Sequence, residues 1–139
     1  MQGLVVARLM SRFEAFSDLA AMLDDDLLAR KVDVPKHKSL AEHLWCVVGA
    51  RESYSQAIEH GAWTGFSCSM GSFGAADFVA KLEESRLAAE HILRGVTDWT
   101  EERSRLLMTL SEHEVMHEGQ IIRHMYAIEQ TLPASWVWA

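Results

Sequence analysis

Three histidines in this chain have the residue type and spacing that metal coordination requires. His113 and His117 are four residues apart within HEVMH, and residues four apart lie on the same face of a helix. Two imidazoles placed in this way can share one metal ion. His43 lies in an earlier segment among apolar residues, so we expect it to face inward and to supply a third nitrogen. Three nitrogen ligands leave positions open for water or substrate, as in catalytic rather than structural metal sites.

HEVMH also fits the HExxH motif of zinc proteases, but the neighbouring residues do not support that chemistry. A protease would need Glu114 as general base and a further ligand beyond His117. The positions three and six residues after His117 are Gln120 and Arg123 rather than glycine and histidine. A di-iron carboxylate bundle would need a second Glu-x-x-His motif beside Glu114 and His117, and the sequence has none. Both alternatives are disfavoured.

Other polar residues near the motif have less specific expected roles. Gln120 shares the histidine face, where it can line a pocket, orient a bound water or hydrogen-bond the backbone. Glu114 points away from His113, which suits a solvated position or an ion pair between helices. His124 continues the histidine stripe, but we do not expect it to be a ligand. Three further histidines are expected in a loop, at a helix end and on the surface: His37, His60 and His91.

Four amphipathic segments are predicted to position these residues. Apolar residues recur in them at spacings of three and four, which is typical of helices, and no segment alternates with a period of two. Ser39 and Glu42 form a capping box at the start of one segment. Thr109 and Glu112 resemble a second one, which leaves open whether the last helix breaks near residue 108. The expected helices span residues 3–30, 39–60, 75–95 and 100–130, which makes the chain an all-α four-helix bundle.

The connection between the second and third expected helices is long enough to cross the bundle. Residues 61–74 contain four of the eight glycines and no charged residue. Fourteen residues can span roughly 46 Å when extended. A 20-residue helix is only about 30 Å long. The loop can therefore cross the length of the bundle and make the second and third helices parallel.

Length and composition restrict the function classes. A chain of 139 residues is expected to form one domain, residues 1–139. Its 13 basic and 20 acidic residues give a formal net charge of −7, which argues against nucleic acid and against an anionic membrane surface as partners. Arg8 and Arg12 interrupt the apolar N-terminal stretch, so no signal peptide is expected. The cytoplasm is the predicted location, with Cys46 and Cys68 as free thiols.

Two motifs together resemble a known superfamily. They are LAEHLWCVVGARESY, which contains His43, and HEVMHEGQI, which contains His113 and His117. With the closing segment LPASW, they make the chain similar to the DinB/YfiT-like superfamily of small metal-binding four-helix bundles, over essentially its whole length. The resemblance implies parallel second and third helices. It also implies a triad of His43, His113 and His117 around a divalent ion such as nickel or zinc.

The resemblance also implies a class of reaction. Members of the superfamily include thiol-dependent transferases and isomerases, in which the metal activates a low-molecular-weight thiol for attack on a small-molecule substrate. A hydrolase that uses a metal-bound hydroxide is a variant of this chemistry. The alternative is a non-catalytic bundle that binds a metal or a small ligand. Trp136 and Trp138 are expected to dock on the bundle or on a partner subunit, and a homodimer is expected.

Overall fold

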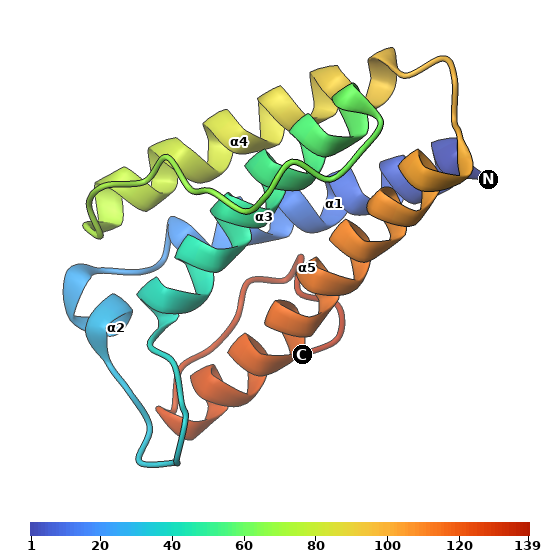
Figure 1. Ribbon diagram of the computed structural model, residues 1–139. Helices are drawn as coiled ribbons and strands as arrows, with labels where there is room; N and C mark the ends of the chain where they lie inside the picture. The colour runs from blue at the N-terminus through green and yellow to red at the C-terminus, as the bar shows by residue number, and fades with distance from the viewer.

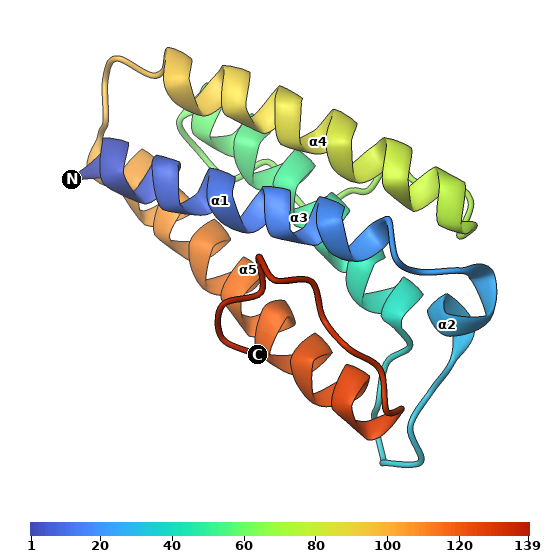
Figure 2. The same cartoon turned by 180° about the vertical axis from the view of Figure 1, so that it is seen from behind.

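The structure, a computed structural model, describes all 139 residues and contains only helices. The chain forms four long helices and one short one. Figures 1 and 2 show the long helices side by side and the short one near one end of them. The all-helical architecture predicted from the sequence is confirmed. None of the helices is both long and apolar enough to span a membrane. The helices are α1 (Gln2–Ala20), α2 (Asp25–Ala29), α3 (Leu40–His60), α4 (Ala75–Gly95) and α5 (Glu101–Ala127).

The first predicted helix, residues 3–30, is in fact two helices. α1 ends at Ala20, and the short α2 starts after Asp24, whose side chain accepts a hydrogen bond of 2.8 Å from the Leu27 amide. Apolar residues continue at helical spacing across this break, which is why periodicity alone predicted one element. The aspartate cap starts a new helix in a new direction.

Of the two capping boxes that the sequence suggests, one forms and the other does not. At the start of α3, the Ser39 hydroxyl accepts from the Glu42 amide at 3.1 Å, and the Glu42 carboxylate accepts from the Ser39 amide at 2.6 Å. This capping box confirms the prediction. Thr109 instead lies inside α5, and its hydroxyl donates to the Arg105 carbonyl at 3.0 Å. α5 therefore runs through residue 108 without a break.

We expect Ser39→Ala to lower the free energy of unfolding by about 1 kcal/mol, because it removes the acceptor for the Glu42 amide. Urea denaturation measures the change. Ser11→Ala is the matched control, since that exposed hydroxyl bonds only to a carbonyl of its own helix. The control should stay within about 0.5 kcal/mol of the parent. Equal effects of the two substitutions would contradict the capping role.

The C-terminal segment packs back onto α1. Trp136 is buried, its ring centroid lies 5.1 Å from that of Phe16, and its indole N–H donates to the Ala15 carbonyl at 2.8 Å. Trp138, by contrast, is 67% exposed. Docking on the bundle is therefore confirmed for Trp136, whereas Trp138 does not dock on it, and docking of Trp138 on a partner subunit stays a prediction.

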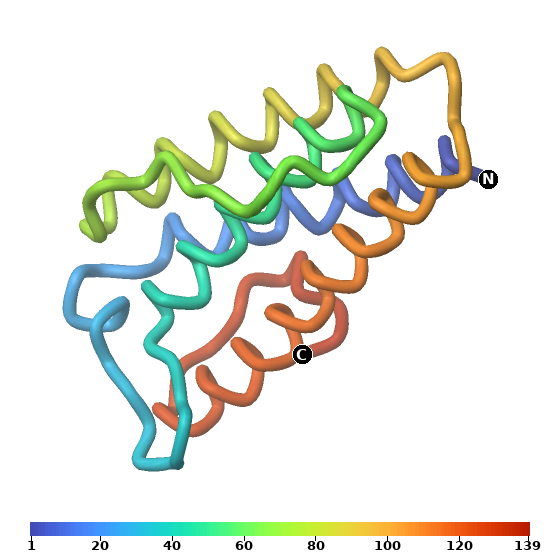
Figure 3. Tube along the Cα trace, in the orientation of Figure 1, coloured from blue at the N-terminus to red at the C-terminus, as the bar shows by residue number.

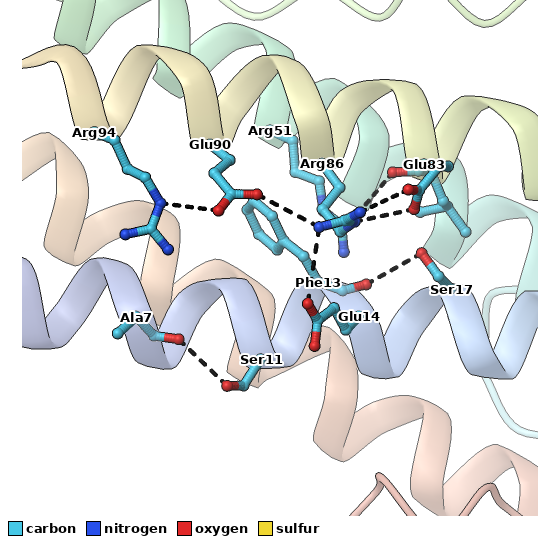
Figure 4. A network of polar contacts seen from close by, with 11 residues as sticks. Ala7, Ser11, Phe13, Glu14, Ser17, Arg51, Glu83, Arg86, Glu90 and Arg94 are labelled. Carbon is cyan, nitrogen blue, oxygen red and sulfur yellow. Dashed lines mark hydrogen bonds and ion pairs between the residues drawn. The ribbon is translucent and has the colours of Figure 1, made fainter.

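On the outside of the bundle, α4 and α1 are joined by charged side chains. Arg86 on α4 pairs with Glu83 at 2.6 Å and reaches Glu14 on α1 at 3.8 Å, as Figure 4 shows. Arg94 pairs with Glu90 at 2.8 Å one turn further along. Exposed pairs of this kind contribute little free energy. The packing of α4 on α1 therefore depends mainly on apolar burial.

The segment 61–74 runs back along α3. Ser67 exchanges two hydrogen bonds of 2.9 Å with the Ser53 hydroxyl, and Cys68 lies near the Trp45 carbonyl. Gly49 allows this close approach, because a Cβ atom there would collide with the Phe66 ring. Figure 3 shows the segment returning toward the N-terminal end of α3, where α4 begins.

Candidate metal centre

Two of the three predicted ligands are in direct contact. His43 projects from α3 and His117 from α5, and both are almost fully buried. Their Nδ1 atoms lie 2.9 Å apart, and the rings meet edge to face with centroids 5.2 Å apart. One of these nitrogens must donate a proton to the other. The sequence prediction that two separate helices bring these histidines together agrees with the structure.

His113 lies beside this pair without completing a triad. Its ring centroid is 4.5 Å from that of His117, and its Nδ1 is buried without a hydrogen-bond partner. As the side chains stand, no three His, Cys, Asp or Glu residues are grouped so that they could hold a metal ion. Coordination by all three histidines would require their side chains to rearrange.

Burial keeps these imidazoles neutral. Desolvation lowers the pKa of His43 to about 4 and that of His117 to about 3, and it also lowers the pKa of His113. A neutral imidazole offers a lone pair to a metal, whereas an imidazolium does not.

The distance between the two imidazoles also suits a metal. Two imidazole nitrogens on one tetrahedral zinc ion lie about 3.3 Å apart. The 2.9 Å separation of His43 and His117 needs only slight widening to reach that value. The two imidazoles of His43 and His117 are thus a donor pair of the kind that divalent ions such as nickel or zinc bind, and the unpartnered nitrogen of His113 lies nearby without joining them.

A cavity of about 460 Å³ opens beside His43 and His117. Its size suits a small molecule. Gln120 is solvent-exposed and borders this cavity, which agrees with the pocket position expected from the sequence. The other lining residues come from the 35–38 loop and from α5: Pro35, Lys36, His37, Lys38, Met116 and Arg123.

His37 and His124 form a second pair that was not anticipated. His37 Nε2 lies 2.7 Å from His124 Nδ1, and the two rings stack with centroids 4.8 Å apart. His124 is fully buried, and its Nε2 has no partner. His37 lies in a loop, as expected, but its ring is half-buried because this loop folds onto α5. The contact with His124 fixes this loop to α5.

Glu114 belongs to the bundle core, not to the histidine site. It is fully buried and pairs with Arg51, so the inter-helix ion pair expected from the sequence is confirmed and the solvated alternative is wrong. One turn later, Glu118 is also buried and pairs with Arg12 at 2.7 Å. Sequence reasoning missed Arg51, although its place four residues after buried Val47 put it on the inner face of α3.

Comparisons with known proteins found no relative of this chain. No protein-family model matches the chain, and no curated protein matches it either. Membership in the DinB/YfiT-like superfamily therefore stays a prediction from the sequence motifs.

Proposed function

We propose that the chain is a metal-dependent enzyme whose divalent ion, nickel or zinc, is held by His43, His113 and His117. The observation that carries this proposal is the contact between two buried, neutral imidazoles from different helices, next to a third that has an unpartnered nitrogen. A buried imidazole nitrogen without a polar partner, such as Nδ1 of His113, is costly, and an ion shared with His43 and His117 would satisfy it. The adjoining cavity would admit the substrate.

We further propose that the helices form a DinB-like four-helix bundle in which residues 61–74 cross over and make α3 and α4 parallel. The hydrogen bonds of this segment to Ser53 and Trp45, which place it along the side of α3, support that topology. In such a bundle α3 and α5 are neighbours that can share one site. His43 and His117 come from these two helices.

The residues around the cavity suggest how the reaction would proceed. When bound, the ion would lower the pKa of a thiol or a water that coordinates it. His43 and His117 are nearly buried, so they would hold it from the protein side and leave the cavity side open to a low-molecular-weight thiol and an electrophilic substrate. Gln120 can donate its amide to a group of the substrate. The proposed reaction class is thiol transfer, with hydrolysis as the variant.

Metal titration tests the site. After chelation and dialysis, the parent should bind one Ni²⁺ or Zn²⁺ per chain by isothermal titration calorimetry. His43→Ala and His117→Ala should each weaken binding by at least about 100-fold, because losses of 10- to 100-fold already follow when only a ligand's supporting partner is removed. His91→Ala is the control, since His91 is exposed on α4. No binding by the parent, or equal losses in the control, would overturn the triad.

An activity assay separates the enzyme from a simple binder. The loaded protein is incubated with glutathione or N-acetylcysteine and with chlorodinitrobenzene as the electrophile. Thiol transfer that disappears in His117→Ala but not in His91→Ala supports the enzyme. A protein that binds the metal and turns over no substrate across a broad panel is instead a non-catalytic metal-binding bundle.

A further inference from the structure

The cavity beside the histidines carries positive charge that runs against the balance of the whole chain. The protein has a formal net charge of −7. Yet three side chains that line this cavity are the cations Lys36, Lys38 and Arg123, and no aspartate or glutamate lines it. A concave surface with charge of one sign concentrates ligands of the opposite sign.

These three cations are also unusual in having no carboxylate partner. Eight of the thirteen lysines and arginines form ion pairs. The five without an ion pair are Arg8, Arg30, Lys36, Lys38 and Arg123, so three of the five line one cavity. The one hydrogen bond among those three joins Lys38 to the Cys46 thiol at 3.5 Å. Their charge is thus not neutralised by any acidic side chain.

The fold holds the two lysines in place through His37, which stands between them in sequence. The His37–His124 contact fixes the loop to α5, next to Arg123. Lys36 has a φ of 62°, a left-handed conformation that is uncommon for residues other than glycine. Conformations of this kind persist where surrounding contacts enforce them, and they cluster at ligand sites. The loop therefore presents Lys36 and Lys38 to the cavity from an anchored backbone.

We propose that this cavity binds a small anionic molecule whose carboxylate or phosphate group is held by Lys36, Lys38 and Arg123. Binding itself does not depend on the proposed function. Only the conclusion that the bound molecule reacts at the metal rests on it. The Arg123 guanidinium can bind two oxygens of such a group at once, and the lysines act as point charges beside it. The rest of the molecule would then face His43 and His117. The substrate or thiol of the proposed enzyme is, in this view, an anion.

This inference is tested by titrating the metal-free protein with inorganic phosphate and with succinate, with NMR as the readout of binding. Both probes should bind saturably, and Arg123→Gln and Lys38→Gln should each weaken binding by about tenfold or more. Arg8→Gln is the matched control, because Arg8 is also a cation without an ion pair, but it lies on α1, which contributes no residue to this cavity. It should bind like the parent. Circular dichroism establishes that each variant is folded.

The outcomes separate this inference from the proposed function. Absence of saturable binding in the parent, or equal losses in Arg123→Gln and Arg8→Gln, would overturn the anion site. Ni²⁺ binding is measured on the same samples. Metal binding without anion binding would overturn only the anion site, whereas anion binding without metal binding would support it and overturn the proposed metal centre.

Discussion

Replacing Arg51 with methionine is expected to lower the free energy of unfolding by about 3–5 kcal/mol. Arg51 extends from α3 and is fully buried, and its guanidinium contacts the other three long helices. It pairs with Glu114 of α5, donates to the Leu82 carbonyl of α4 at 3.4 Å, and lies 3.9 Å from the centre of the Phe13 ring of α1. Without it, the Glu114 carboxylate is buried with no compensating charge.

The second half of this experiment distinguishes lost charge from lost packing. The double variant Arg51→Met, Glu114→Leu should recover most of the loss, because apolar residues of similar volume can replace a buried ion pair at little cost. Arg105→Met is the control, since Arg105 is exposed and pairs only with Glu101 and Glu102. Its effect should be below about 1 kcal/mol. Urea denaturation measures all four proteins. A similarly small effect for Arg51→Met would contradict the central role of the pair.

Acid should destabilise the metal-free protein through the buried histidines. The native pKa is about 4 for His43 and about 3 for His117, while an unfolded histidine titrates near its ordinary value of 6.5. Between these values the unfolded chain binds protons that the native chain does not. Stability is therefore retained above about pH 6.5 and falls as the pH drops toward 4. Each histidine contributes about 1.4 kcal/mol per pH unit, or about 2.7 together.

Urea denaturation at pH 6 and pH 5 measures this slope. His117→Gln should lower the slope by about 1.4 kcal/mol per pH unit, the share of His117, because that group no longer titrates. Comparing the variant with the parent cancels the contribution of Glu114, whose pKa is raised by burial and which acts in the opposite direction. His91→Gln should keep the parental slope. A slope that is the same in His117→Gln and in the parent would contradict the neutral buried pair.

Much of the fold could be predicted because the deciding signals are local. The capping box of Ser39 and Glu42 lies within four residues, and it places the start of α3 correctly. The break after α1 was missed although three aspartates mark it, since Leu23, Leu27 and Leu28 continue the apolar spacing on the other side. The apolar periodicity of a sequence predicts which residues face the core, but it does not indicate where a helix ends and the next one takes a new direction.

The site could be predicted only where helix faces determine it. The spacing of His113 and His117, and the apolar surroundings of His43, were enough to expect a common location on neighbouring helices. His37 could not be assigned in this way, because it lies in a loop where periodicity gives no direction. Its contact with His124, and the cationic lining of the cavity, depend on how that loop folds back onto α5.

The return of residues 61–74 along α3 has a consequence for the rate of folding. In helical bundles with short turns, most contacts form between residues close in sequence, and such chains fold fast. Here residues 61–74 turn back along α3, so that Cys68 lies near the carbonyl of Trp45, 23 residues earlier, and the Trp136 indole donates to the Ala15 carbonyl across 121 residues. Closing such long loops costs entropy before any contact compensates for it. This chain should therefore refold more slowly than a bundle of equal length whose helices are joined only by short turns.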